Sequence, residues 1–156
     1  MKKITLYSDG ACSPNPGVGG YGAIAVYKAH RKEFSKGFKS TTNNRMELLG
    51  LIEPMESLKE PCEVHAVTDS QYVANAINKG WIKGWIKKGW KTAAKKPVKN
   101  QDLWNRLIKL INKHSLTVEW VRGHDGHTEN ERCDILAVEA REGINLAEDK
   151  DYKERD

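Results

Sequence analysis

The chain has 156 residues, a mass of 17.6 kDa and a formal net charge of +5, values typical of one small domain. Five Trp and five Tyr residues exclude a largely disordered chain. The longest charge-free run, residues 10–27, contains five Gly and two Pro, and only residues 4–7 separate Lys3 from Ser8-Asp9. We therefore expect neither a membrane span nor a signal peptide, and we expect a cytoplasmic protein.

The first forty residues predict an antiparallel meander of three strands. Residues 3–7 alternate between apolar and polar side chains and run into Asp9-Gly10, where we expect the strand to end. Pro14-Asn15-Pro16-Gly17 is typical of a turn. Residues 22–27 and 33–39 have the alternation of two further strands.

From Asn44 the apolar residues follow helical spacing, which predicts a helix over residues 44–58 with a kink at Pro54. The later predicted elements are strands at 64–68 and 116–121 and helices at 70–77, 101–112 and 129–142, the last opened by a Thr128-x-x-Glu131 capping box. This order predicts an α/β fold with a mixed five-stranded sheet, an antiparallel meander plus parallel strands, flanked by helices. We expect one domain, residues 1–143, and a short charged tail, residues 144–156, that is mobile from Leu146 onward.

The charge is distributed unevenly along the chain. Residues 70–101 contain eight lysines and no acidic residue, so this segment carries +8 and the rest of the chain −3. Trp81 and Trp85 are one helical turn apart and are expected to pack inward. The lysines expected to face solvent beside them are Lys83, Lys87 and Lys88. Such a run is often only a solvated face, but a basic lobe on an acidic body also fits a nucleic-acid partner.

Two other motifs are poor matches to the sites that they suggest. Gly17-x-Gly19-x-x-Gly22 matches the dinucleotide fingerprint, but residues 23–27 predict a strand where the pyrophosphate needs a helix N-terminus, so we interpret these as turn glycines. His124, His127 and Cys133 have the spacing of no zinc module and lack a fourth ligand. The three cysteines form no C-x-x-C pair, which favours a reducing cytoplasm over a disulfide framework.

Four carboxylates stand where open α/β sheets carry their sites. Asp9 and Asp69 each end a predicted strand, and Glu47 and Asp134 lie in the first turns of predicted helices. Each alone has a structural alternative, as a helix cap, a turn residue or a partner of the helix dipole. If all four converge, they need a hard divalent cation, because like charges that close cannot all stay ionised unaided. We therefore predict a site for Mg²⁺, with Mn²⁺ as the alternative.

His124 lies in a loop flanked by glycines between the last predicted strand and helix. Because imidazole titrates near neutrality, a histidine beside a metal site can shuttle protons. The alternative is an exposed loop histidine. The adjacent Asp125 is expected to favour the protonated form of His124 and to shift the pH optimum.

These residues resemble the type I ribonuclease H family, and in particular its bacterial members with a basic protrusion. The resemblance covers about residues 3–142 in order. The matching stretches are Ser8-Asp9-Gly10, Asn15-Pro16-Gly17-x-Gly19-Gly20-Tyr21-Gly22, Thr41-Thr42-Asn43-Asn44-Arg45-Met46-Glu47-Leu48, Thr68-Asp69-Ser70-Gln71-Tyr72-Val73, Gly89-Trp90-Lys91-Thr92 and Val121-x-Gly123-His124-x-Gly126-His127 into Asn130-Glu131-Arg132-Cys133-Asp134.

The resemblance implies an endonuclease that uses two Mg²⁺ ions to hydrolyse the RNA strand of an RNA–DNA hybrid, with 5′-phosphate and 3′-hydroxyl products. Carried over position by position, the metal-binding carboxylates are Asp9, Glu47, Asp69 and Asp134. His124 would assist the leaving product or shuttle a proton.

The resemblance also implies which residues bind the hybrid. To distinguish RNA from DNA, the protein needs residues that contact the 2′-hydroxyl group of the RNA strand. The residues implied to face the minor groove are Gly10, Cys12, Asn44, Glu47 and Gln71, and those implied to grip the DNA strand are Asn15, Thr42 and Asn43. The protrusion, residues 79–99, would lay Trp81 and its lysines along the same strand.

Two alternatives remain beside this interpretation. A hybrid-binding module without catalysis would keep the basic lobe but lack a carboxylate, and none of the four is missing. A junction resolvase or an integrase core shares a carboxylate cluster, but the stretch Thr42-Asn43-Asn44-Arg45 and the basic lobe favour the hybrid enzyme. We expect a monomer.

Overall fold

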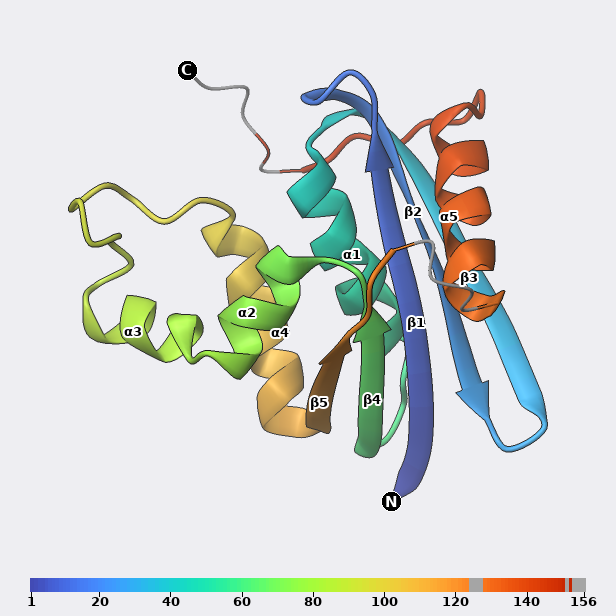
Figure 1. Ribbon diagram of the computed structural model, residues 1–156, viewed down its shortest axis with the longest axis horizontal. Coiled ribbons are helices and arrows are strands. Elements are labelled where there is room, and N and C mark those ends of the chain that lie inside the picture. The colour runs from blue at the N-terminus through green and yellow to red at the C-terminus, as the bar shows by residue number, and fades with distance from the viewer. Residues whose placement is uncertain (124–127, 151, 153–156) are drawn as a thin grey trace.

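The computed structural model describes residues 1–123, 128–150 and 152, and its elements follow the predicted order, with one further helix, α3 (Trp81–Lys87), that was not predicted (Figure 1). The strands are β1 (Lys2–Cys12), β2 (Gly17–Tyr27), β3 (His30–Thr41), β4 (Cys62–Thr68) and β5 (Ser115–Trp120). The helices are α1 (Asn43–Glu56), α2 (Gln71–Asn78), α3 (Trp81–Lys87), α4 (Gln101–Lys113) and α5 (Thr128–Arg141). In the described part of the chain, no helix has the length and apolar character needed to cross a bilayer.

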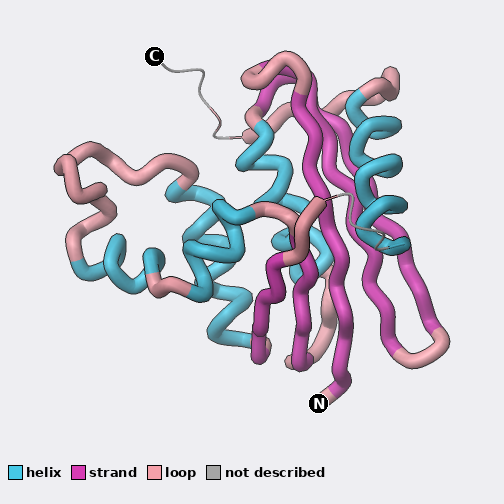
Figure 2. The backbone as a smooth tube through the Cα atoms, viewed as in Figure 1, coloured by secondary structure: helices cyan, strands magenta, loops and turns pink. Residues whose placement is uncertain are grey.

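The five strands form one mixed sheet in the order β3-β2-β1-β4-β5 (Figure 2). β1 pairs antiparallel with β2, and β2 pairs antiparallel with β3. β4 lies parallel to both β1 and β5. This is possible because helices carry the chain back along the sheet before β4 and again before β5. The predicted α/β class and mixed five-stranded sheet are therefore confirmed.

Helices cover both faces of the antiparallel half of the sheet (Figure 1). Neighbouring residues of β2 point to opposite faces, as strand geometry requires. Ala23 belongs to the large core that includes α1 and α4, whereas Ile24 packs against Cys133 and Leu136 of α5. The chain around α2 and α3 extends away from the sheet on the side of β5. β1 is thus held between two layers of helix, which fixes the side chains that it carries.

The first two strands are longer than the sequence predicted. β1 continues through Asp9 to Cys12, and the glycine-rich stretch 17–22 forms the start of β2 instead of a turn. The predicted strand end at Asp9 and the interpretation of these residues as turn glycines are therefore wrong. The other boundaries agree within three residues. Since a strand and no helix follows the glycines, the dinucleotide site stays excluded.

The glycines of β2 allow α5 to lie close to the sheet. A Cβ atom at Gly20 would lie 2.6 Å from the carbonyl oxygen of Ala137, and one at Gly22 would lie 2.5 Å from the Cβ of Leu136. No side chain fits between this strand and the helix backbone. Because Gly22 pairs with Asp9 across the sheet, the same close approach sets the distance between α5 and Asp9.

We expect Gly22→Ala to lower the free energy of unfolding by about 1–3 kcal/mol, because the added methyl group must displace the backbone of α5. Urea denaturation measures this change. The matched control is Gly84→Ala in α3, where the new methyl group meets nothing within 4 Å beyond its chain neighbours and the backbone of its own helix. At that partly exposed helical position the free energy of unfolding should rise by about 0.5–1 kcal/mol. Equal stability changes in the two variants would contradict the tight packing of α5.

The C-terminal segment, which we define as residues 146–150, is attached to the body of the protein. The amide of Ala147 donates to the carbonyl of Gly37 (2.8 Å), and the amide of Lys39 donates to the carbonyl of Ala147 (2.9 Å). The side chain of Asp149 is only 3% exposed. The prediction of a mobile tail is therefore wrong for these residues.

Candidate active site

Three carboxylates from separate elements converge beside β1. Ser8 pairs with Thr68 in the parallel register of β1 and β4, so Asp9 and Asp69 follow at the same level of the sheet. Glu47 reaches the same point from the second turn of α1. One oxygen from each of these three carboxylates lies within 4.8 Å of the other two. The structure thus brings together three of the four predicted metal ligands.

Gly10 allows α1 to approach β1 closely enough for this convergence. A Cβ atom at Gly10 would lie 2.7 Å from the amide nitrogen of Glu47. The amide of Gly10 donates to Oδ1 of Asp9 (2.9 Å) and to Oε1 of Glu47 (3.1 Å). One backbone group therefore orients two carboxylates.

Burial and mutual repulsion make these carboxylates difficult to ionise together. Burial, followed by the charge of Asp69, raises the pKa of Asp9 to about 8. Burial and the charges of Asp9 and Asp69 hold the pKa of Glu47 well above its usual range. Among the described residues, Oε2 of Glu47 is buried without a hydrogen-bond partner. Crowded oxygen donors with an unpaired buried oxygen fit a hard divalent cation such as Mg²⁺ or Mn²⁺.

A cleft opens beside the three carboxylates, and Asp134 of α5 lines it with them. Its other lining residues are Gly10, Asn43, Asn44, Ser70, Gln71 and Tyr72. All four predicted carboxylates therefore border one cleft. Four of the residues predicted to bind substrate also line this cleft. They come from β1 and from the first turns of α1 and α2, and they are Gly10, Asn43, Asn44 and Gln71.

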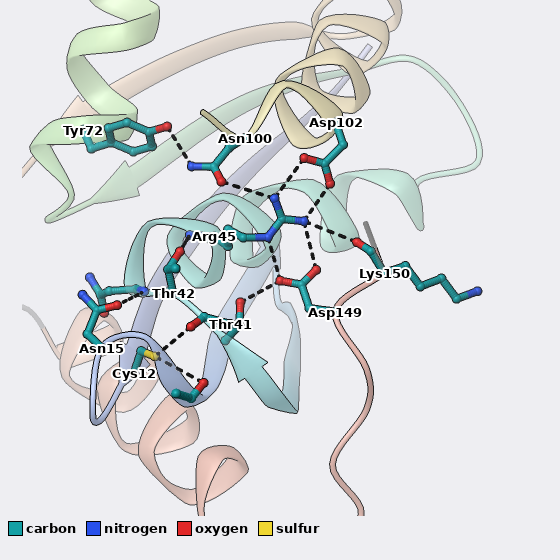
Figure 3. Close-up of polar contacts among 12 residues, drawn as sticks. Cys12, Asn15, Thr41, Thr42, Arg45, Tyr72, Asn100, Asp102, Asp149 and Lys150 are labelled. Carbon is teal, nitrogen blue, oxygen red and sulfur yellow. Dashed lines mark hydrogen bonds and ion pairs between the residues drawn. The ribbon is translucent and has the colours of Figure 1, made fainter. Parts of the chain in front are cut away.

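Three other residues predicted to bind substrate do not line this cleft. Cys12, Asn15 and Thr42 lie in and around the neighbouring turn (Figure 3). The thiol of Cys12 donates to the carbonyl of Thr41 (3.5 Å), and the side-chain oxygen of Asn15 accepts from the amide of Asn43 (3.1 Å). The hydroxyl of Thr42 caps α1. Cys12 and Asn15 thus bond the turn between β1 and β2 to the start of α1, and Thr42 caps that helix. Asn43 and Asn44 lie in its first turn.

The basic lobe, residues 79–99, presents its lysines to solvent as predicted. The exposed lysines on and just after α3 are Lys83, Lys87 and Lys88. The prediction that Trp81 packs inward is wrong: its ring lies 6.4 Å from that of Trp85 but is 40% exposed. Trp85 does pack inward, with its ring 5.3 Å from that of the buried Trp104. The lobe thus has an aromatic base and a basic, partly aromatic surface.

Two residues that lie against Asp69 were not predicted to contact it. The indole nitrogen of Trp120 donates to the carbonyl oxygen of Asp69 (3.0 Å). A Cβ atom at Gly123 would lie 2.9 Å from Oδ2 of Asp69. The only signal in the sequence was their position, Trp120 within the last predicted strand and Gly123 directly before His124. His124 itself lies outside the described residues, as do Asp125 and His127.

We expect Trp120→Phe to weaken Mg²⁺ or Mn²⁺ binding by about tenfold, because the phenyl ring cannot donate to the carbonyl of Asp69. Calorimetric titration of the metal-free protein measures this affinity. Trp120 is 41% exposed, so the fold should survive the change, as circular dichroism would verify. An unchanged affinity in a folded variant would show that this hydrogen bond does not orient Asp69.

Comparison with known proteins gives consistent matches. A family model described as RNase H matches residues 1–142. A curated protein named ribonuclease H from Desulforamulus reducens is 59% identical over 146 residues, which are 94% of this chain and 92% of that protein. One from Aeromonas hydrophila subsp. hydrophila is 56% identical over 153 residues, 98% of this chain and 99% of that protein.

Solved structures agree with these relatives. LC9-RNase H1, described as a type 1 RNase H with the type 2 active-site motif, has a TM-score of 0.82 at 30% identity and covers 92% of this chain and 74% of that chain. RNase H1 from Halobacterium salinarum NRC-1 has a TM-score of 0.65 at 25% identity and covers 90% of this chain and 98% of that chain.

Proposed function

This chain belongs to the ribonuclease H family and is an enzyme, and from that premise we propose that it is an endonuclease that hydrolyses the RNA strand of RNA–DNA hybrids. The observation that carries the proposal is the cleft bordered by four carboxylates, three of which lie within 4.8 Å of one another. A module that only binds nucleic acid has no need to bury such mutually repelling groups.

Asp9, Glu47, Asp69 and Asp134 would hold two Mg²⁺ ions, with Mn²⁺ as the alternative. When bound, the ions would supply an activated water molecule and neutralise the charge on the leaving 3′ oxygen, which leaves 5′-phosphate and 3′-hydroxyl products. Gly10 orients Asp9 and Glu47 through its amide, and Trp120 fixes the carbonyl of Asp69. In the same proposal His124 transfers a proton to the leaving product.

The walls of the cleft, the turn beside it and the basic lobe would together select the hybrid. The residues proposed to face the minor groove and the 2′-hydroxyl are Gly10, Cys12, Asn44, Glu47 and Gln71. Those proposed to grip the DNA strand are Asn15, Thr42 and Asn43, with Trp81, Lys83, Lys87 and Lys88 farther along it. The exposure of the lysines and the presence of Asn43, Asn44 and Gln71 in the cleft support this assignment. The wider proposal is a monomeric, cytoplasmic enzyme whose single catalytic domain, residues 1–143, includes the lobe 79–99.

Cleavage of an end-labelled RNA–DNA hybrid in Mg²⁺ tests this function. The matching RNA–RNA and DNA–DNA duplexes and an Asp69→Asn variant are the controls. We expect cuts only in the RNA of the hybrid, and their loss in the variant. Tight hybrid binding without cleavage in Mg²⁺ or Mn²⁺ would overturn the catalytic assignment and leave a binding module. Cleavage of the DNA duplex would indicate a carboxylate-cluster nuclease of another kind.

A further inference from the structure

Arg45 is a buried cation in the first turn of α1, between the cleft residue Asn44 and the carboxylate of Glu47. Its side chain is only 2% exposed. The guanidinium group turns away from the cleft, toward α4 and the C-terminal segment (Figure 3). Its nearest anionic partners are Asp102, at 2.6 Å, and Asp149, at 2.7 Å. Two carboxylates, each more than fifty positions from Arg45 in the sequence, therefore meet on its side chain.

Asp149 holds the start of α1 from the side of the C-terminal segment. Its carboxylate accepts from Nε of Arg45 (2.7 Å), from Nη2 of Arg45 (3.0 Å) and from the hydroxyl of Thr41 (2.6 Å). Thr41 ends β3 and is followed directly by the helix cap Thr42, whose hydroxyl accepts from the amide of Arg45 (3.2 Å). The hydrogen bonds of Ala147 to β3 fix the segment that carries Asp149. The C-terminal segment is thus bonded both to the end of β3, at Thr41, and to the first turn of α1, at Arg45.

A second branch of the same network reaches the opposite wall of the cleft. Nη1 of Arg45 donates to the side-chain oxygen of Asn100 (3.2 Å), and the side-chain nitrogen of Asn100 donates to the hydroxyl of Tyr72 (3.1 Å). The indole of Trp104 donates to the same hydroxyl (3.1 Å). Tyr72 lines the cleft from α2, directly after Gln71. Arg45 therefore connects the two helix starts that border the cleft.

The geometry of this network favours a role in orientation over a role in stability alone. Arg45 donates to Asp102 through two nitrogens (2.9 and 2.6 Å) and to Asp149 through two (2.7 and 3.0 Å), a pair of forked contacts that fix a planar guanidinium. Buried ion pairs add little net stability compared with apolar residues of similar volume. Two such forks do fix the direction of the helix turn from which Arg45 projects.

We propose that Arg45, Asp102 and Asp149 are positioning residues for the substrate. By this inference the C-terminal segment, residues 146–150, is a working part of the enzyme. Through Arg45 it holds the first turn of α1, which carries Asn43 and Asn44, in the arrangement that binds the hybrid. Through Arg45 and Asn100 it also holds Tyr72. The inference rests on the proposed assignment of Asn43 and Asn44 to the hybrid.

Asp149→Asn in the full-length protein tests this inference. The substitution removes the charge and places an amide against the guanidinium of Arg45, so one fork is lost. We expect the KM for the hybrid, and its dissociation constant measured by fluorescence anisotropy without divalent ions, to rise about tenfold, because small displacements of contact groups have large effects. The kcat at saturating hybrid should change less than about twofold. All measurements are made well below the melting temperatures.

The matched control is Glu53→Gln, at the other end of the same helix. Glu53 accepts a hydrogen bond from the hydroxyl of Tyr21 (2.6 Å) and lies 3.8 Å from Arg106, so its loss also removes a carboxylate from a polar network of α1. It should lower the melting temperature without changing KM. If Asp149→Asn does not fold, Thr41→Val removes only the hydroxyl that donates to Asp149, and KM should rise about threefold.

An Asp149→Asn protein with a lower melting temperature but the KM and dissociation constant of the parent would overturn the inference, since its role would then be structural only. An Asn44→Ala variant separates this result from a failure of the proposed substrate contacts. If Asn44→Ala binds the hybrid as tightly as the parent, the assignment of Asn44 fails. If Asn44→Ala weakens binding and Asp149→Asn does not, the positioning inference alone fails.

Discussion

An Asp9→Asn protein is expected to lose hybrid cleavage and yet, in metal-free buffer at pH 8, to unfold at a higher temperature than the parent. Cleavage should fall by about 10³-fold or more, because a lost metal ligand removes several kcal/mol of transition-state stabilisation. Stability should rise because Asp9 is buried against Asp69 and Glu47, and its carboxyl resists ionisation. A tenfold change in proton affinity is worth about 1.4 kcal/mol, so the gain is of the order of a few kcal/mol.

The sign of the pH dependence follows from the direction in which folding moves this pKa. Folding raises the pKa of Asp9 from its usual value near 3.8 to about 8, chiefly through burial and then the charge of Asp69. Between these two pH values the folded protein binds more protons than the unfolded chain, so this group lowers the free energy of unfolding as the pH rises. The asparagine does not titrate. The stability of the variant relative to the parent should therefore grow from about pH 4 to pH 8.

Thermal unfolding in a chelator, from pH 5 to pH 9, measures this difference. Added Mg²⁺ should raise the melting temperature of the parent more than that of Asp9→Asn, because a bound cation stabilises the ionised carboxylates. The matched control is Glu60→Gln, which removes an exposed carboxylate paired with Lys2. That change should leave the pH profile close to the parent's. A variant less stable than the parent at pH 8 would mean that the carboxylates of the cleft do not repel one another.

The order of the elements was predictable because local patterns determine it. Alternation in the strands and helical spacing after Asn44 place seven of the nine predicted elements within three residues of their observed bounds. The failures lie where a distant partner decides the local structure. Two of the glycines in residues 17–22, Gly20 and Gly22, lie in a strand on which α5, more than a hundred positions later, packs directly. Nothing near those glycines in the sequence indicates the helix.

The same reason limits what the sequence reveals about the site. The carboxylates were recognisable because Asp9 and Asp69 end predicted strands, and Glu47 and Asp134 lie in the first turns of predicted helices. The structure brings three of them together, Asp9, Glu47 and Asp69. The residues that hold them were not recognisable. Asp149 was predicted to lie in a mobile tail, because the residue that holds it, Arg45, lies 104 positions earlier in the sequence. Trp120 resembled an ordinary strand residue, and only the folded chain shows its hydrogen bond to Asp69.

The basic lobe gives the second large expected effect. Replacing Lys83, Lys87 and Lys88 together with Gln should weaken hybrid binding by about 10³-fold in 0.1 M salt, because each of the three lost phosphate contacts removes roughly one factor of ten at that salt concentration. The kcat at saturating hybrid should stay near that of the parent, since these lysines lie on and after α3, away from the carboxylates at β1 and β4 (Figure 1).

The salt dependence separates direct phosphate contacts from the effect of net charge. If all three lysines contact phosphates, the slope of log affinity against log salt should flatten by about 2.7 in the variant. The matched control replaces Lys28, Lys32 and Lys36 on the β2–β3 hairpin, which removes the same three charges at the far side of the sheet. It should change the slope little, because charges farther away than the Debye length of about 10 Å are largely screened in 0.1 M salt. Equal losses of affinity in both triple variants would mean that the lobe acts only through the net charge of the protein, and that the hybrid does not lie along α3.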